Sequence, residues 1–336
     1  MHLRVRAARE QDQAEIMALA KIAGVGMSSL PQDAEVMGKK IDRSVRSFAG
    51  SPVRPHEESF LFVLEDIENK RLAGTTGIVA HVGLSRPFYS YKVSTISQAS
   101  SGVGVYSMQH VLHMVNDYTG ASEIGSLFLH PEYRRDGIGG FLSRCRYMML
   151  AEFEHLFSDV VISEIRGVQD SAGNSPFYDN LARHFFKMEF QKADYIYATQ
   201  GGQFIADLMP KYPIYANLLP KAAQDVIGVP FEASRPALHL LKTEGFNYEG
   251  YVDLFDAGPT VQVKRSAIET VHKSSKSEVI AVRPLKSEPH IICNTRLNDF
   301  MITKGGLEQG KDGVVITPEV AEAIKVKAGD MVRYVV

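Results

Sequence analysis

Cysteine and net charge are both scarce in this sequence. Its 336 residues include 2 Cys, and neither belongs to a CxxC pair of the kind that indicates a zinc site or a redox dithiol. We therefore expect Cys145 and Cys293 to be reduced, buried thiols, and we expect no bound metal. The formal net charge is −2, from 37 Lys and Arg against 39 Asp and Glu. No field of one sign is available to gather nucleic acid or an anionic membrane surface, so neither is expected as a partner.

Long apolar runs are also missing. Charged residues, Gly or Pro interrupt every apolar run well before the ~20 residues that would span a bilayer. The chain begins with MHLRVRAAREQDQ, in which charges alternate with apolar residues, whereas a signal peptide needs an uninterrupted apolar stretch after its basic end. The sequence therefore predicts a cytoplasmic protein.

The size of the chain favours two domains. With 45% hydrophobic residues it can form a sizeable core, and single cores stop growing near ~250 to 300 residues. The stretch 264–276 is polar and lacks periodicity, which predicts a linker. We expect one domain over residues 1–262 and a second over 263–336. In the second, short β-like runs, a capped helix from Pro318 and a terminal strand favour a small β-barrel.

The first domain has the element order of an α/β protein. Apolar periodicity and turn residues predict, in chain order, a strand at 2–6, a helix at 10–23, a hairpin at 59–82, a pair of β-like runs before Ser122, a strand at 123–129, a long helix at 139–157 and a strand at 160–165. This order predicts a mixed α/β fold whose ligand lies at the carboxyl ends of central strands.

A glycine-bearing loop between the strand at 123–129 and the long helix is the most informative segment. It reads Arg134-Arg135-Asp136-Gly137-Ile138-Gly139-Gly140. Glycines let backbone N–H groups point inward, and the first turn of a helix adds unpaired N–H donors and the positive end of its dipole. Such a loop suits a pyrophosphate, although a helix that merely begins with flexible residues would look the same. Its spacing matches neither the dinucleotide GxGxxG pattern nor the lysine-bearing triphosphate loop.

With a strand before it and a helix after it, the Arg-x-x-Gly-x-Gly spacing resembles the coenzyme A loop of the GNAT acyltransferases. That resemblance implies a GNAT-like acyl-CoA N-acyltransferase domain, with the pyrophosphate bound by the loop residues Arg134, Arg135, Gly137, Ile138, Gly139 and Gly140. It also implies that backbone amides of Ser126, Leu127 and Phe128 contact the thioester and its pantetheine arm. Amide donors there would stabilise the oxyanion formed in acyl transfer.

Longer stretches resemble the arginine N-succinyltransferase family over nearly the whole chain. They include SSLPQDAE from Ser28, LFLHPEYRRDGIGGFLSRCR from Leu127, EIRGVQDSAGNSPFYDNLARHFFKMEF from Glu164, EGFNYEGYVDLFDAGPT from Glu244 and the AGDMVR ending. The resemblance implies transfer of a succinyl group from succinyl-CoA to the α-amine of arginine or ornithine, in arginine catabolism. It further implies acyl-CoA and a small amine as partners, and either a homo-oligomer or pairing with a related subunit.

The resemblance also exposes a departure in the catalytic residues. The family's proton-donating histidine corresponds to Phe231, which cannot transfer a proton. Tyr178 is a candidate donor for the departing thiolate, and Glu123 is a candidate base for the amine, although packing and an ion-paired strand end explain them equally well. Glu232, His184 and His239 are weaker candidates to take over its role.

Substrate recognition requires opposite charges at the two ends of the site. An arginine-like amine needs carboxylates, and a succinyl carboxylate needs a bidentate cation such as Arg166. The candidates for contacts with the amine substrate are Asn116, Asp117, Glu123, Ser175, Asp253 and Asp256. Structural ion pairs or loop capping would place the same residue types there. The alternative to an active succinyltransferase is a member that binds acyl-CoA with another substrate, or without catalysis, as a regulatory or partner subunit.

Overall fold

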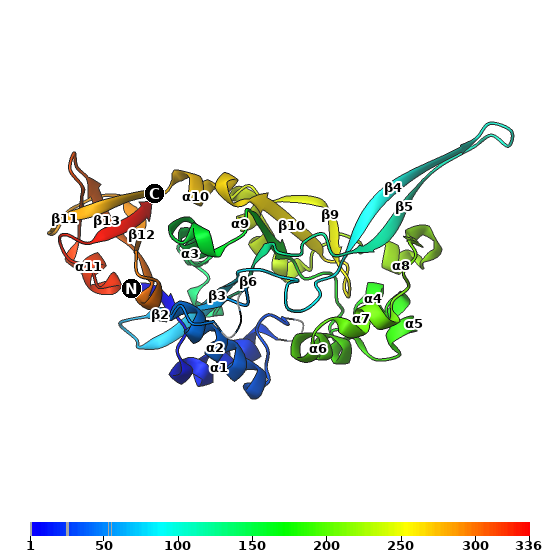
Figure 1. Cartoon of the computed structure of the whole chain (residues 1–336), viewed down its shortest axis with the longest axis horizontal. Helices are drawn as coiled ribbons and strands as arrows, with labels where there is room; N and C mark the ends of the chain where they lie inside the picture. Colours follow the sequence, from blue (N-terminus) through cyan, green and yellow to red (C-terminus); the bar gives the residue numbers. More distant parts are fainter. Residues whose placement is uncertain (1, 25–26, 53, 55) are drawn as a thin grey trace.

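The computed structural model describes residues 2–24, 27–52, 54 and 56–336. It is a mixed α/β protein with a barrel at one end and a protruding hairpin at the other (Figure 1). The strands are β1 Leu3–Ala7, β2 Ser59–Asp66, β3 Arg71–Val79, β4 Ser90–Ser100, β5 Val105–Val115, β6 Ser122–Leu129, β7 Val160–Glu164, β8 Ile214–Tyr215, β9 Asn247–Asp253, β10 Pro259–Lys264, β11 Ser275–Val282, β12 Pro289–Asn294, β13 Met301–Gln309, β14 Val314–Ile316 and β15 Met331–Val335.

The helices lie on both faces of the sheet and around its far end. They are α1 Gln13–Ala23, α2 Ala34–Phe48, α3 Ile138–Glu152, α4 Pro176–Asn180, α5 Arg183–Phe186, α6 Phe190–Gln200, α7 Gln203–Leu208, α8 Lys221–Gln224, α9 Arg235–Thr243, α10 Glu269–Lys273 and α11 Pro318–Ile324. Together with the strands they confirm the predicted α/β class. The predicted elements up to β7 occur in the predicted order, but α2 lies between two of them and was not predicted.

The central sheet runs in the order β1-β2-β3-β6-β7-β10-β9-β4-β5-β8. Its neighbouring strands are antiparallel except for β6 and β7, which run parallel. A parallel pair needs a crossover, and α3 supplies it. The loop predicted to bind a ligand therefore lies at the carboxyl end of β6, where the crossover begins.

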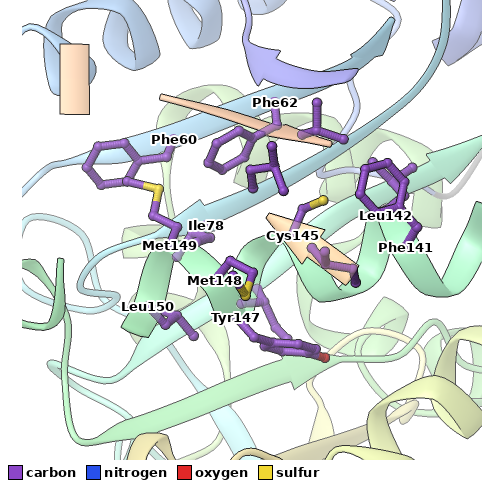
Figure 2. Close-up of a cluster of buried hydrophobic side chains, with 14 of the residues drawn as sticks. Phe60, Phe62, Ile78, Phe141, Leu142, Cys145, Tyr147, Met148, Met149 and Leu150 are labelled. Atoms are coloured by element: carbon purple, nitrogen blue, oxygen red, sulfur yellow. The ribbon is translucent and has the colours of Figure 1, made fainter. Parts of the chain in front are cut away.

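Strand β2 is apolar on both faces because helices cover both. Leu61 and Val63 pack with α1 and α2, whereas Phe60 and Phe62 belong to the cluster that contains α3. Figure 2 shows this second cluster, in which side chains of α3 such as Met149 lie against Phe60, Phe62 and Ile78 of the sheet. Side chains that alternate along a strand point to opposite faces, so one strand anchors both layers.

The predicted helix at 139–157 is too long. α3 ends at Glu152, because Phe153 leaves the helical conformation with φ −119° and ψ 49°, and a short 3-10 turn follows over Glu154–Leu156. The Phe153 side chain is buried, with its ring centroid 5.3 Å from that of Phe300. The apolar pattern continues at helical spacing beyond Glu152, which is why the prediction was too long. The helix itself ends there because Phe153 packs against the C-terminal region.

The prediction of a linker at 264–276 is wrong for most of that stretch. It contains α10 and the start of β11, and the polar side chain of Thr270 is buried. Both the Thr270 backbone N–H and its hydroxyl donate to the Glu244 carboxylate, at 2.8 and 2.7 Å. The segment was predicted as a linker because its residues are polar. Their burial depends on Glu244, which lies outside the segment and accepts their hydrogen bonds. The division into 1–262 and 263–336 stays a prediction.

The predicted small C-terminal barrel is confirmed. β12, β15, β11, β14 and β13 pair in that order, and β13 pairs back with β12 to close the ring. β13 also pairs with β1, so the barrel and the central sheet share a strand. Gly305 on β13 permits the close approach of α11, because a Cβ there would lie 2.3 Å from Val320 Cγ2.

Glu152, the last residue of α3, connects the central layer to the barrel. Its carboxylate accepts hydrogen bonds from Lys276 Nζ on β11 at 2.6 Å and from Arg333 Nε on β15 at 2.9 Å. The Glu152 side chain is 4% exposed, so water replaces these contacts poorly.

In the described part of the chain, no helix is both long and apolar enough to cross a membrane.

We expect Glu152→Ala to destabilise the fold by about 2 kcal/mol, because it removes two charge-assisted hydrogen bonds and leaves Lys276 and Arg333 without this ion-pair partner. Urea denaturation of the full chain measures this change. Glu35→Ala is the matched control: its carboxylate pairs with Lys39 on the surface and is 78% exposed, so the loss should stay below ~0.5 kcal/mol. Equal effects of the two substitutions would contradict the connecting role of Glu152.

Candidate functional site

Strands β6 and β7 separate soon after they begin to pair. Their pairing comprises Ser122 with Val161 and Glu123 with Ile162. Further along, the pairing of β6 with β3 on its other side slips between Thr75 and Gly77, which places Ser126 and Leu127 opposite a single residue. Ser126 has φ 53°, the left-handed conformation that marks a bulge in a strand. The bulge turns the backbone of β6 into the gap between the strands.

The bulge is fixed by side chains from two directions. The Thr75 hydroxyl donates to the Ser126 carbonyl at 2.8 Å, and the Ser126 hydroxyl donates to the Ser29 carbonyl at 2.8 Å. Ser29 lies in the segment between α1 and α2, and its hydroxyl also accepts from the Ser126 N–H at 3.3 Å. The Ser126 amide therefore has a partner in the chain, and Phe128 forms a hydrogen-bonded ladder pair with Thr75, so its amide faces β3. The amide of Leu127, in the bulge, is the better donor to a ligand.

The loop after β6 leads into α3 through Gly137, which is the N-cap. Gly137 has φ 72°, a conformation that costs little for glycine, and no side chain caps the helix. A Cβ at Gly139 would lie 3.9 Å from Leu129, and one at Gly140 would lie 3.9 Å from Leu240. Packing within the chain therefore does not require these two glycines. The uncapped amides and the open space beside them can accommodate a diphosphate.

The two arginines of the loop differ in their contacts. Arg134 Nε donates to the Leu129 carbonyl at 3.0 Å, and its guanidinium lies 5.6 Å from the centre of the Phe128 ring. Arg135 has an exposed side chain whose nearest carboxylate is that of Asp136, at 3.8 Å. Arg134 thus fixes the turn at the end of β6, while Arg135 is free to reach an anion. Ile138, the first residue of α3, is buried and anchors the helix start.

We infer a cleft lined by carboxylates beside the start of β6, called the acidic cleft from here on. Glu123 on β6, Glu164 at the end of β7, Asp253 at the end of β9 and Asp194 on α6 are each enclosed by protein but keep partial exposure to solvent. Partial exposure of enclosed side chains is the property of residues in a cleft. Each of the four is close enough to another for its charge to act on that neighbour's ionisation.

Burial is the main cause of the shifted pKa values in this acidic cleft. It raises the pKa of Glu123 to about 7, with Lys40 opposing the shift and Asp253 adding to it. Burial raises the pKa of Asp194 to about 6, again with a contribution from Asp253. The pKa of Glu164 is raised well above its ordinary range by burial and then by the charges of Asp253 and Glu123. The cleft therefore favours a bound cation.

Two cations face the acidic cleft without an ion-pair partner among the described residues. Burial lowers the pKa of Lys40 on α2 to about 8, and the charge of Glu123 partly offsets this. Arg166, just after β7, donates to the side-chain carbonyl of Gln169, and its guanidinium lies 4.5 Å from the centre of the Phe231 ring. Phe231 thus contacts Arg166 through a cation–π interaction.

Two of the predicted site residues are placed in the core. Tyr178 is fully buried, its hydroxyl donates to the Met188 carbonyl at 3.1 Å, and its ring contacts Phe190 and Phe255. Ser175 is also fully buried and caps α4 by accepting from the Tyr178 N–H at 3.3 Å. These contacts are the packing and capping roles that the sequence left open for both residues.

The remaining candidates lie at the edge of the cleft or outside it. Asn116 and Asp117 are exposed after β5; the Asn116 carbonyl accepts from Thr119, and the Asp117 carboxylate accepts from the Tyr251 hydroxyl at 2.9 Å. The Asp256 carboxylate accepts from the N–H groups of Gly167 and Gly258, both at 2.8 Å, which fixes two loops. The weaker substitutes, Glu232, His184 and His239, are exposed.

Sequence reasoning missed several residues around the acidic cleft. Ser29, Lys40 and Asp194 come from elements distant from β6, and none belongs to a motif with a chemical meaning. Asp194 and Ser28 also line a cavity of about 350 Å³ between α6 and the segment that joins α1 to α2. For Asp194, the one signal in the sequence was an acidic residue between Ala193 and Tyr195. In the described residues, no three His, Cys, Asp or Glu side chains are grouped as for a metal ion.

Comparisons with known proteins cover the whole chain. Residues 3–270 match the family model described as arginine N-succinyltransferase beta subunit, and residues 278–336 match the model of that subunit's C-terminal domain. The arginine N-succinyltransferase of Yersinia pestis is 40% identical over 341 residues, covering 99% of this chain and 97% of its own. That of Escherichia coli is 37% identical over 333 residues, covering 98% and 96%.

A solved structure agrees with these matches. The arginine/ornithine succinyltransferase subunit AI from Pseudomonas aeruginosa superposes with a TM-score of 0.88 at 33% sequence identity, covering 99% of this chain and 98% of its own. Sequence and structure are thus similar from end to end, through the bulged strand, the glycine loop and the barrel. The chain belongs to the arginine N-succinyltransferase family of acyl-CoA-dependent N-acyltransferases.

Proposed function

We propose that this protein transfers the succinyl group of succinyl-CoA to the α-amine of arginine, with ornithine as the other acceptor to be tested. The observation that most supports this proposal is the position of the acidic cleft. It lies beside β6, whose backbone turns into the gap between β6 and β7. Relatives at 37–40% identity over the full chain carry the name of this enzyme, which supports the same choice.

The acyl-CoA end of the reaction uses the bulged strand and the glycine loop. The pyrophosphate binds the uncapped first turn of α3, near Gly139 and Gly140, with Arg135 free to add a charge. The thioester lies along the gap between β6 and β7, where the amide of Leu127 donates to its carbonyl oxygen. This donor stabilises the negative charge that develops on that oxygen when the amine attacks.

Glu123 acts as the base that prepares the amine. The ammonium gives one proton to the Glu123 carboxylate, directly or through a water, and the neutral nitrogen attacks the thioester carbon. The C–N bond forms, the C–S bond breaks, and the nitrogen releases its second proton to solvent. CoA leaves as a thiolate that takes up a proton from solvent, and Glu123 returns its proton to solvent. A base is most effective when its pKa lies near the working pH, as the value of about 7 for Glu123 does.

The guanidinium of arginine supplies the positive charge that the acidic cleft lacks. Glu164, Asp194 and Asp253 are enclosed carboxyl groups whose pKa values are raised by burial, so a bound cation would favour their ionised forms. The cavity between α6 and the segment after α1, which Asp194 lines, gives room for the side chain of the amino acid. A guanidinium can contact two carboxylates at once through its planar fork of donors.

Arg166 binds the free carboxylate of the succinyl group. Among the described residues no carboxylate lies within ion-pair distance of it, and its Gln169 contact uses only Nε and one terminal nitrogen. Phe231 covers one face of the guanidinium and holds it in place. Phe231 therefore does not imply lost catalysis: CoA leaves as a thiolate, whose thiol pKa near ~8.5 makes proton donation to it unnecessary.

Thiol release from succinyl-CoA, with arginine, ornithine and lysine as acceptors, tests the function and the loop together. Wild type should turn over succinyl-CoA with arginine. Gly140→Asp adds a negative charge where the pyrophosphate binds and should raise KM for succinyl-CoA at least ~10-fold, while the charge also favours the helix N-terminus and keeps the fold stable. Gly140→Asn has the same size without the charge, so its effect should be clearly smaller. No turnover with any acceptor would contradict the function, and equal effects of Asp and Asn would contradict pyrophosphate binding at this turn.

The pH dependence tests Glu123. In wild type, kcat/KM for arginine should rise with pH through about 7 as the carboxyl group loses its proton. Glu123→Gln should lower kcat/KM by ~100-fold or more and abolish this rise. Glu232→Gln, at an exposed carboxylate beside Phe231, is the control and should leave the profile unchanged. An unchanged profile in Glu123→Gln would exclude Glu123 as the base.

The variant Glu123→Gln should be more stable than wild type at high pH. The folded-state pKa of about 7 exceeds the ordinary value near ~4.3, so the native state retains a proton that the unfolded chain loses. Wild-type stability therefore falls between pH ~4.3 and 7, and the cost remains above pH 7. The Tm of Glu123→Gln minus that of wild type should be larger at pH 8 than at pH 5.

Donor selectivity tests Arg166. Arg166→Leu should lower kcat/KM for succinyl-CoA about 100-fold, or ~2.7 kcal/mol, and leave turnover of acetyl-CoA unchanged because acetyl-CoA has no second carboxylate. Arg166→Lys should give an intermediate loss, since lysine keeps the charge but not the two-pronged contact. Equal losses with both donors would show that Arg166 only supports the cleft.

A further inference from the structure

The two proposed substrates bring four charged groups into the acidic cleft. Glu123 lies at the α-amine of arginine, Asp194 lies on the side of its guanidinium, and Arg166 binds the succinyl carboxylate. The α-carboxylate of arginine is the fourth group, and without a cation beside it the surrounding carboxylates would repel it. Because the α-amine and the α-carboxylate are attached to the same carbon, that cation must lie next to Glu123.

The side chain of Glu123 points to the face of the sheet that α2 covers. Glu123 pairs with Val79 on β3, and Val79 pairs with Ser59 on β2, so these three side chains lie on one face. Leu61, two residues after Ser59, lies on the same face and belongs to one apolar cluster with Met37 of α2. A side chain from α2 can therefore reach the carboxylate of Glu123.

Lys40 is on the side of α2 that faces this part of the sheet. It comes four residues before Ser44, which is fully buried, so the two side chains lie on one side of the helix. Ser44 accepts a hydrogen bond from the Leu61 N–H of β2 at 2.8 Å. Ser29, just before α2, contacts Ser126 of β6. α2 thus crosses the face from β6 toward β2, with the half-buried Lys40 along its path.

A cavity begins one helical turn from Lys40. Val36, four residues earlier on α2, lines the cavity of about 350 Å³ together with Asp194. The charges agree with this placement, because Lys40 acts on the ionisation of Glu123, whereas Arg166 acts on that of Asp194. Lys40, and not Arg166, is therefore the cation next to the proposed base.

The ammonium of Lys40 has no acceptor among the described residues. It makes neither a hydrogen bond nor an ion pair there, although an ammonium carries three donors and enclosed polar groups ordinarily have partners. Burial lowers its pKa to about 8, which Glu123 partly offsets and the exposed Arg43, one turn later, reinforces. An anion that enters the cleft would supply the missing acceptor and favour the charged form.

On the basis of the transfer to arginine proposed above, we propose that the Lys40 ammonium binds the α-carboxylate of the amino acid substrate and so selects α-amino acids among amines. A carboxylate held by Lys40 places the α-amine beside Glu123 and lets the side chain extend along the cavity toward Asp194. An amine that lacks the carboxylate leaves the enclosed ammonium unpaired, and the site disfavours it for that reason.

Comparing arginine with arginine amide as acceptors of succinyl-CoA tests the proposal. Arginine amide keeps the guanidinium and the α-amine but has a neutral carboxamide in place of the carboxylate. At pH 7 the ratio of kcat/KM for arginine to that for arginine amide should fall at least ~10-fold from wild type to Lys40→Met, which keeps the length of the side chain without its charge. The ratio is compared because a change in the ionisation of Glu123 affects both acceptors alike.

Two further variants serve as controls. Lys40→Arg keeps the charge and should retain most of the ratio. Lys39→Met removes a neighbouring lysine that is 73% exposed and pairs with Glu35, and it should leave both kcat/KM values unchanged.

Equal losses of both acceptors in Lys40→Met would overturn the proposal, because Lys40 would then only support the cleft or the ionisation of Glu123. An equal preference of wild type for arginine and arginine amide would overturn it as well. If wild type turns over neither acceptor, the proposed function fails, and calorimetric binding of the two ligands to the CoA-bound protein decides on Lys40 alone. Weaker binding of arginine but not of arginine amide in Lys40→Met would support its role, and equal weakening of both would exclude it.

Discussion

Enclosed carboxyl groups repel one another unless a cation or a proton lies among them, and this constraint governs the centre of the molecule. Glu123, Glu164, Asp194 and Asp253 come from four elements, and burial raises the pKa of each. Retaining them costs folding stability that apolar residues of similar size would not cost. Such a cost is understandable in a site that receives a cationic substrate, where the binding partner provides the missing charge.

The separation of β6 from β7 brings the two halves of the proposed reaction together. The strands pair only at Ser122 and Glu123, so the carboxylate of Glu123 lies where the gap begins. The bulge at Ser126 then turns the backbone amide of Leu127 into the gap, and the glycine loop starts at the end of the same strand. One strand therefore positions the proposed base, the proposed oxyanion donor and the proposed pyrophosphate loop. Ser29, in the segment after α1, hydrogen-bonds to Ser126 and so fixes the bulge. These bonds join the segment proposed to lie beside the amine to the strand proposed to bind the acyl group.

Sequence patterns predicted those parts of the structure that depend on interactions between residues close together in the chain. The glycine loop, the strand before it and the start of α3 follow from backbone rules over about fifteen residues, and all were predicted. The end of α3 was not, because the buried contact of Phe153 with Phe300 joins residues far apart in the sequence. The polar stretch around Thr270 was misread for the same reason, since its partner is Glu244. Asp194 and Lys40 join the acidic cleft only through tertiary folding. Sequence reasoning therefore found Glu123 and Asp253, but not the lysine whose charge opposes the rise in the pKa of Glu123.

The central claim is that the acidic cleft is a site for a guanidinium, and isothermal titration calorimetry tests it most directly. The ligand is the arginine analogue that lacks the α-amino group, titrated at pH 7 into the CoA-bound protein in two buffers with different heats of ionisation. Without the amine, any exchanged proton comes from the protein. The account predicts binding with release of protons, because the guanidinium lowers the raised pKa values of the carboxyl groups. Binding with equal heats in both buffers, or no binding at all, would contradict it.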